Sequence, residues 1–246
     1  MLVDRVDRAS AIVMLRGFLR DGGRHQIVTV NLDFMRLADR DPAYRAVLNR
    51  ADLAVADGMP LVWFSRLGTA SLPERVAGID LVEQCCRLAT EESVPVFFLG
   101  ALPGVAAEAA RVLSGRYPGL RIAGTYSPPF GPASSEGDEE IVRVVSAAGR
   151  CVLLVAFGAP RQDRFISDHL HEFDAAIAMG VGGSFDIFAG TLRRAPFWMQ
   201  RTGFEWIWRL MQEPRRLWRR YLVEDVPFIL RLGARAARGR IALDVG

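Results

Sequence analysis

Several polar side chains in this sequence come directly after short apolar runs, where they could take part in chemistry. Asp57 follows the apolar run 53–56 and precedes Gly58. Strands covered by helices on both faces of a parallel sheet are apolar throughout, and ligands bind beyond their carboxyl ends. A carboxylate in that position can accept a proton from a bound hydroxyl group. Asp is also a favoured N-cap, so the alternative is that Asp57 only caps a helix beginning near Met59.

Three more polar residues occupy comparable positions. Thr29 and Asn31 lie two positions apart at the end of the β-branched run 26–30, so both can point to one side of a strand end. Gln162 falls in the first turn of a helix that follows the apolar run 151–156. These residues could orient a ligand, although Asn31 is equally suited to capping the next helix.

Arg75 is a candidate for binding phosphate. It lies in the loop 73–78 between two predicted helices. A guanidinium can hold a phosphate through two parallel hydrogen bonds. The alternative is an exposed arginine that contacts only water.

A glycine-containing turn follows the apolar run 94–99. Gly100 and Gly104 lie in this turn, and a helix is predicted from there to about residue 116. A strand, a glycine turn and a helix N-terminus form a natural seat for a diphosphate, because free N–H groups and the helix dipole favour anions. The dinucleotide fingerprint G-x-G-x-x-G is absent, which argues against a nicotinamide-dependent epimerase or dehydrogenase.

A second glycine-rich turn follows the apolar run 174–179. It includes Gly182, Gly183 and Asp186 in the sequence Gly-Val-Gly-Gly-Ser-Phe-Asp. Three glycines in four residues allow the backbone to approach a ligand closely. Packing alone could also require them.

Apolar runs and helical patterns alternate about six times over residues 26–190. This alternation predicts an α/β fold: a Rossmann-like, mostly parallel sheet with helices on both faces. The polar and glycine-rich strand ends are expected to meet at one crevice.

The composition changes after residue 192. Residues 193–246 hold 12 Arg against 5 acidic residues, and four of the five Trp. We therefore predict an α/β domain over 1–192 and a basic helical appendage over 193–246. Arginines interleaved with Trp and Leu suit a membrane surface with anionic lipid. Packing on the main domain and nucleic-acid binding are less favoured alternatives.

The chain has no apolar window of the length that crosses a membrane and no signal-peptide pattern at its start. We expect a protein that is made and kept in the cytoplasm. All 31 basic residues are Arg, so a Walker-type phosphate loop and a Schiff-base lysine are excluded.

Taken in order, eight segments resemble the WecG/TagA/CpsF family of bacterial glycosyltransferases. Each motif is weak alone, but the ordered set covers nearly the whole chain. The segments are TVNLDF (29–34), ADGMP (56–60), ERVAGID (74–80), FLGALPG (98–104), FGAPRQD (157–163), GVGGSFDIFAG (180–190), RRAP (193–196) and GFEWIWRLMQEPRRLWRRY (203–221).

The resemblance implies an inverting glycosyltransferase that works without a metal ion or other cofactor. It would move a hexose (N-acetylmannosamine, its uronic acid or a related hexose) from a UDP-sugar to a polyprenyl-diphosphate-linked sugar. Such reactions build teichoic acid, enterobacterial common antigen-like, capsule or exopolysaccharide polymers. The implied protein is peripheral on the inner face of the cell membrane, binds no nucleic acid and can form homo-oligomers. The competing hypothesis is a non-catalytic protein that binds a nucleotide sugar and docks on the membrane.

The resemblance also assigns roles to residues. Asp57 matches the family's candidate general base, which favours catalysis over capping at this position. The residues that would orient donor or acceptor are Thr29, Asn31 and Gln162.

The leaving UDP would be stabilised by Arg75, by the helix N-termini at Gly104 and Gly183, and by an arginine of the appendage. The candidates for that arginine are Arg215, Arg219 and Arg220.

Overall fold

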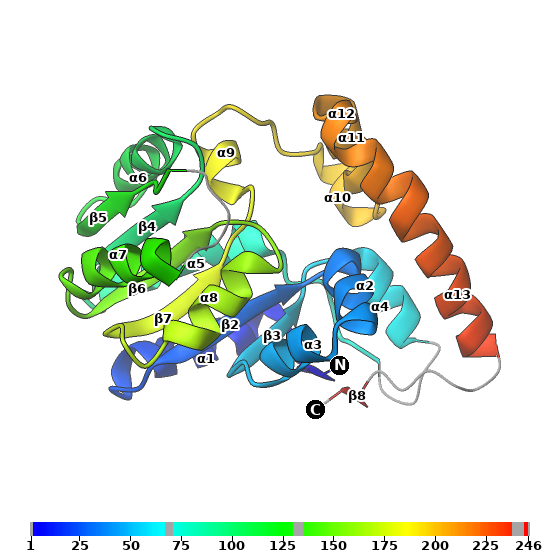
Figure 1. Ribbon diagram of the computed structural model, residues 1–246, viewed down its shortest axis with the longest axis horizontal. Helices are drawn as coiled ribbons and strands as arrows, with labels where there is room; N and C mark the ends of the chain where they lie inside the picture. Colours follow the sequence, from blue (N-terminus) through cyan, green and yellow to red (C-terminus); the bar gives the residue numbers. More distant parts are fainter. Residues whose placement is uncertain (1, 67–70, 130–134, 238–243, 246) are drawn as a thin grey trace.

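The protein is built on one six-stranded parallel sheet, seen here in a computed structural model that describes residues 2–66, 71–129, 135–237 and 244–245 (Figure 1). The strand order is β3-β2-β7-β6-β4-β5, and every pairing is parallel. The predicted α/β fold is therefore confirmed. The strands are β2 (His25–Val30), β3 (Leu53–Ala56), β4 (Val96–Gly100), β5 (Ile122–Tyr126), β6 (Cys151–Ala156) and β7 (Ala175–Gly180).

Several strands of this sheet, the edge strand β3 included, are buried along their whole length. Every residue of β3, β6 and β7 is buried. Helices on both faces remove the need for polar residues at alternate positions, which is why these strands read as continuous apolar runs. The sequence predicted β3 and β6 with their observed bounds for this reason.

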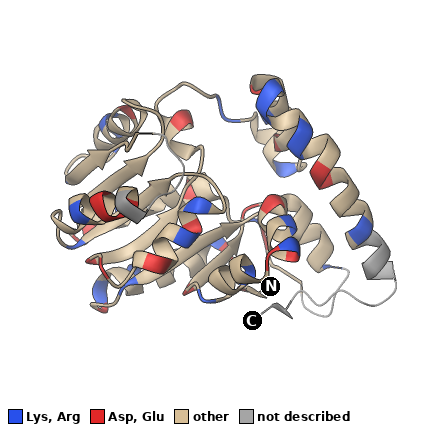
Figure 2. Ribbon diagram, viewed as in Figure 1, with Lys and Arg blue, Asp and Glu red and all other residues tan. Residues whose placement is uncertain are grey.

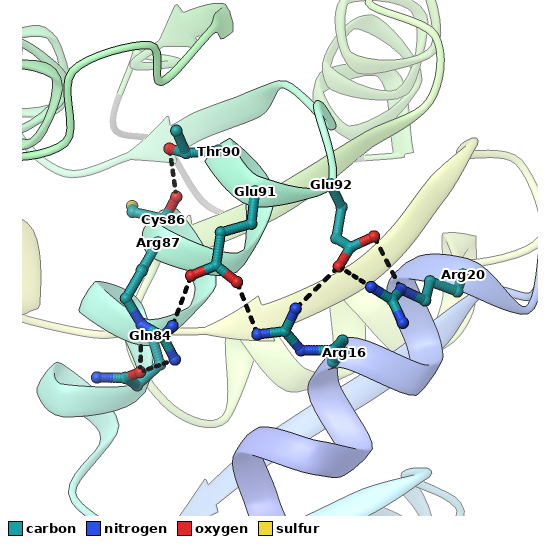
Figure 3. A network of polar contacts seen from close by, with 8 residues as sticks. All are labelled: Arg16, Arg20, Gln84, Cys86, Arg87, Thr90, Glu91 and Glu92. Atoms are coloured by element: carbon teal, nitrogen blue, oxygen red, sulfur yellow. Dashed lines mark hydrogen bonds and ion pairs between the residues drawn. The ribbon is translucent and has the colours of Figure 1, made fainter.

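One face of the sheet is covered by α1 (Arg8–Arg20), α5 (Gly78–Glu91), α6 (Val105–Arg116) and the short α9 (Ser184–Phe188). Their apolar sides share one core with the strands. Polar contacts add to the α1–α5 packing, where Arg16 and Arg20 bind Glu91 and Glu92 (Figure 3). Most of these side chains reach solvent, so each pair contributes little, about 0–1 kcal/mol.

The other face is covered in two halves. Helices α2 (Leu32–Arg40), α3 (Pro42–Asn49) and α4 (Met59–Ser65) pack on β2 and β3. Helices α7 (Ser135–Ser146) and α8 (Arg161–His169) pack on β4 and β6. The prediction of helices on both faces is confirmed.

The C-terminal part is helical and lies beside α2 and α4, at the opposite end of the molecule from β5 (Figure 1). Within the described residues, none of the helices has both the length and the apolar character needed to cross a membrane. The domain boundary after residue 192 stays a prediction. The helices are α10 (Phe197–Arg201), α11 (Glu205–Gln212), α12 (Pro214–Trp218), the π-helical segment η1 (Arg219–Asp225) and α13 (Val226–Ala237).

The two ends of the chain meet at the β3 edge of the molecule. The short strand β1 (Leu2–Val3) pairs in parallel with β8 (Asp244–Val245). Nearby, Phe228 of α13 is buried in the same core as β2, β3 and α2. The C-terminal helices are thus packed on the sheet domain through apolar contacts as well as polar ones.

A buried ion network fixes η1 to α2. The Arg36 guanidinium binds Asp33 within α2, Asp225 at 3.1 Å and Glu224 at 2.8 Å. Asp33 also binds Arg220 at 3.0 Å. Leaving one member of such a buried network without its partner costs about 3–5 kcal/mol, so the network constrains where η1 can lie. It thereby places Arg220 over the carboxyl ends of the strands.

Candidate active site

Four adjacent strand ends open into a polar cavity of about 170 Å³. The ends of β2, β3, β6 and β7 form its floor, and the C-terminal helices form the opposite wall. This is the edge at which parallel α/β sheets bind ligands. Its polar lining includes Thr29, Asn31, Asp57, Arg75, Gln162, Glu205, Arg209, Glu213, Arg216 and Arg220.

Strand register brings Asn31 and Asp57 together. Val30 pairs with Ala56, so the residues that follow each strand emerge side by side. Asn31 caps α2, its Oδ1 accepting hydrogen bonds from the Asp33 and Phe34 N–H groups at 3.0 and 3.4 Å. The capping role considered for Asn31 is confirmed, and the residue also lines the cavity.

Asp57 does not cap the helix that follows it. Gly58 is the N-cap of α4, and no side chain accepts a capping hydrogen bond there. The carboxylate instead lies next to the first residue of α5, Gly78, whose backbone N–H donates to it. A side chain at residue 78 would lie 3.2 Å from Thr29 and 3.3 Å from the Asp57 carboxylate. The absence of a Cβ at Gly78 therefore lets these two polar groups share the site.

Arg75 bridges the sheet domain and the C-terminal helices. Its Nη2 lies 2.7 Å from Glu205 of α11 and 3.6 Å from the Asp57 carboxylate. Its Nε donates to the Asp57 carbonyl at 3.3 Å, and Nη1 donates to the Gln200 carbonyl at 3.3 Å. The alternative of an exposed, solvated arginine is therefore wrong.

Burial raises the pKa of Asp57 to about 6. The Arg75 charge lowers this pKa, but less than burial raises it, and Glu205 raises it further. Three other carboxylates line the cavity, and each makes a closer ion pair: Asp33 with Arg220, Glu205 with Arg75, and Glu213 with Arg216 at 2.7 Å. Asp57 is thus the cavity carboxylate best suited to take up a proton near neutral pH.

Gln162 links the segments that follow β6 and β7. Its buried Oε1 accepts hydrogen bonds from the Gly158 and Gly182 N–H groups, both at 3.1 Å. A Cβ at Gly180 would lie 2.4 Å from the Gln162 amide nitrogen, so this strand end requires glycine. Gln162 therefore shapes the glycine turns that line the cavity.

A second cavity of about 290 Å³ adjoins the first and is largely apolar. It lies between α4 and the C-terminal helices. Both cavities share Asn31, Asp33, Asp57, Arg75, Glu205, Arg209, Arg220 and Tyr221. The apolar side chains of the second cavity are Leu32, Met59, Pro60, Trp63, Phe64, Phe204, Trp206, Val226 and Ile229.

The structure brings most of the predicted site residues together. Those that line the polar cavity are Thr29, Asn31, Asp57, Arg75, Gln162, Gly182, Gly183 and Arg220. Five others do not line either cavity, and their roles stay predictions: Gly100, Gly104, Asp186, Arg215 and Arg219.

Strand order explains why Gly100 and Gly104 lie away from both cavities. β4 lies beyond β6, away from β2 and β3, so Gly100 and Gly104 follow a more distant strand. Gly100 still has a structural reason to be glycine, because its φ is +99° and a Cβ would lie 2.8 Å from the Ala156 carbonyl oxygen. Asp186 accepts a hydrogen bond from the Thr191 hydroxyl.

Sequence reasoning missed several cavity residues on the C-terminal helices. Glu205 and Arg209 are four residues apart on α11, and Arg216 and Arg220 are also four apart. This helical spacing puts each pair on one face. Arg215 and Arg219 belong to a different face and line neither cavity. The spacing itself was the available signal, together with Pro214, which suits the first turn of a new helix.

The chain contains one Asp-x-Asp sequence, Asp39-Arg40-Asp41. Asp41 caps α3 and binds Arg164, and the two aspartates lie outside both cavities. Among the described residues, no group of three or more His, Cys, Asp or Glu has the arrangement of a metal site.

Comparison with known proteins gives the family. Residues 1–241 match the model of the glycosyl transferase WecG/TagA/CpsF family. The chain belongs to this family. It is similar to the N-acetylglucosaminyldiphosphoundecaprenol N-acetyl-beta-D-mannosaminyltransferases of Bacillus spizizenii (38% identity over 80% of this chain and 74% of the relative) and Bacillus subtilis (34%, with the same coverage). The enzyme of the same name from Staphylococcus aureus is 32% identical over 86% of this chain and 80% of the relative.

These relatives are transferases, so the WecG/TagA/CpsF member described here is a glycosyltransferase. This finding argues against the hypothesis of a non-catalytic binding protein. The family resemblance seen in the ordered motifs is confirmed.

The charges around Asp57 lead to a prediction for its pKa. Glu205→Gln should lower the pKa of Asp57, because it removes a nearby negative charge. Arg75→Met should raise it, because it removes the cation that favours the carboxylate. Carboxyl ¹³C NMR titration of the ligand-free protein measures both, with Asp57→Asn identifying the resonance. Unchanged values in both variants would contradict the described charge arrangement.

Proposed function

We propose that this protein transfers a hexose from a UDP-sugar to the sugar of a polyprenyl-diphosphate-linked acceptor. The acceptor class follows from the names of the relatives, which act on N-acetylglucosaminyldiphosphoundecaprenol. The observation that carries the proposal is the position of Asp57, at the junction of a polar cavity and an apolar one. A nucleotide sugar and a lipid-linked sugar could meet there.

Asp57 is the proposed general base. The acceptor hydroxyl would give its proton to the carboxylate while its oxygen attacks the anomeric carbon and the bond to UDP breaks. A single in-line displacement needs one base and inverts the anomeric centre. The raised pKa of Asp57, about 6, supports this role because the proton affinity of the base lies close to the working pH.

Arginines are the proposed counter-charges for the leaving UDP. Arg75, Arg209, Arg216 and Arg220 line the polar cavity, and arginine binds phosphate oxygens through paired hydrogen bonds. Together they could stabilise the charge that develops on the diphosphate without a metal ion. We therefore propose a metal-independent reaction, with Thr29 and Gln162 shaping the floor of the donor site.

The donor sugar is proposed from the relatives alone. They transfer N-acetylmannosamine, and UDP-N-acetylmannosamine is accordingly the first donor to test. The product would be an intermediate of a cell-surface polysaccharide.

A UDP-release assay with a synthetic polyprenyl-diphosphate N-acetylglucosamine acceptor tests this function. UDP release in EDTA should depend on both acceptor and donor. Asp57→Asn should keep UDP affinity and lose about 10²-fold or more in kcat, the usual contribution of a general base. The control Asp80→Asn removes a carboxylate outside both cavities and should keep most activity. Near-normal turnover by Asp57→Asn would reject the base.

We also propose that the C-terminal helices bind the inner surface of the cell membrane. Large apolar side chains are exposed there, including Trp198, Met211, Trp218, Leu222 and Leu230. Basic residues occur on the same helices (Figure 2). Exposed Trp beside arginine suits an interface with anionic lipid.

Vesicle co-sedimentation tests this surface. The double variant Trp198→Ser/Trp218→Ser should bind vesicles containing anionic phospholipid several-fold more weakly than the unmodified protein. Binding of the unmodified protein should weaken as salt rises, because salt screens the charge attraction. The matched control is Val13→Ser, an exposed apolar residue on α1. Equal binding by all three proteins would rule out the proposed surface.

A further inference from the structure

The apolar cavity opens directly onto Asp57 and Arg75, and its apolar lining is unlike that of the polar cavity proposed for the nucleotide sugar. Its walls come from two parts of the chain. α4 supplies Trp63, and the C-terminal helices supply Phe204, Trp206 and Ile229. The two walls are in close contact at one point, where a Cβ on Gly203 would lie 2.5 Å from the Trp63 ring. The cavity is therefore formed only when the C-terminal helices are seated on the sheet domain.

Large apolar side chains remain exposed at this cavity. Trp63 is 44% exposed, Phe204 45% and Val226 41%. A concentration of exposed apolar side chains around a hollow marks a binding site for an apolar group. Phe64, Val226 and Ile229 line the α4–α13 side of the hollow. The one acidic residue beside them, Asp225, is buried and paired with Arg36 at 3.1 Å.

The positive charges lie at the other end of this cavity. Arg75, Arg209 and Arg220 line the junction with the polar cavity, next to Asp57. A ligand that fits this arrangement has a hydrocarbon chain, then an anionic group, then a hydroxyl that can reach the Asp57 carboxylate. A prenyl diphosphate sugar has these three parts in this order.

We propose that the apolar cavity binds the isoprene units next to the diphosphate of the acceptor. This inference rests on the proposed function and adds to it a subsite for the lipid. A volume of about 290 Å³ is at the lower limit of small-molecule pockets, which hold roughly 300–1,000 Å³. Only the first units of a polyprenyl chain can therefore lie inside, and the rest must leave through the opening beside Trp63 and Val226.

The subsite makes the enzyme selective for lipid near the diphosphate. Each buried methylene group contributes about 0.8 kcal/mol, and about 1.4 kcal/mol corresponds to a tenfold change in affinity. Burying even part of one isoprene unit should thus be measurable. Selectivity should depend on residues that line the cavity and be insensitive to exposed apolar residues elsewhere on the protein.

The test compares two acceptors that differ only in lipid: farnesyl-diphosphate N-acetylglucosamine and its methyl-diphosphate counterpart, at a fixed detergent concentration. The unmodified enzyme should prefer the farnesyl acceptor by about tenfold or more in kcat/KM. Ile229→Asp places a charge in the cavity and should bring this ratio close to one. Val13→Asp is the control, because Val13 of α1 is 71% exposed, lines neither cavity and lies outside the proposed membrane surface. It should keep the ratio.

Two results would overturn the subsite: equal use of both acceptors by the unmodified enzyme, or a farnesyl preference that Ile229→Asp and Val13→Asp retain equally. If Ile229→Asp does not fold, as judged by circular dichroism, Trp63→Ala takes its place with the same expected loss of preference.

Calorimetry separates this inference from the proposed reaction. If the enzyme turns over neither acceptor, the proposed function fails, but farnesyl diphosphate should still bind more tightly than inorganic diphosphate. The cavity variant should lose that difference in affinity, and Val13→Asp should keep it. Equal affinity for both probes in the unmodified protein would overturn the subsite independently of turnover.

Discussion

The site depends on one shared cation. Arg75 lies between Asp57, on the sheet domain, and Glu205, on the C-terminal helices. Its charge limits how far burial raises the pKa of Asp57, while Glu205 acts in the opposite sense. The proposed base, its counter-charge and a residue of the C-terminal helices are thus coupled by electrostatics. The Asp57 carboxylate has this charge environment only when the two parts of the chain are in contact.

Two kinds of contact keep those parts together. The buried Arg36 network holds η1 on α2, and Phe228 packs in the core beside β2 and β3. The packing of the C-terminal helices on the sheet domain also forms both cavities. One is polar and lies at the strand ends, and the other is apolar and lies between α4 and α13. Asp57 lies at their junction. This division is well suited to a reaction between a water-soluble nucleotide sugar and a lipid-linked sugar.

The sequence predicted what depends on local pattern. Continuous apolar runs identified the strands, and a polar residue at a strand end identified Asp57. The position of Gly100 could not be predicted, because it depends on β4 lying beyond β6, and strand order is not encoded by any local pattern. The sequence led us to choose Arg219, whereas Arg216 lines the cavity. The correct choice depends on which face of the C-terminal helices turns toward the sheet, and this could not be known from the sequence. Glu205 carried no signal except its spacing from Arg209.

The pH dependence of kcat/KM tests the central claim, that Asp57 is the base and that Glu205 tunes it. A base with a pKa of about 6 is protonated and inactive below that pH, so kcat/KM should fall with a midpoint near pH 6. In Glu205→Gln the midpoint should move to lower pH, since the pKa of Asp57 falls when the neighbouring negative charge is removed. An acid limb with the same midpoint in both proteins, or none near pH 6, would contradict the account.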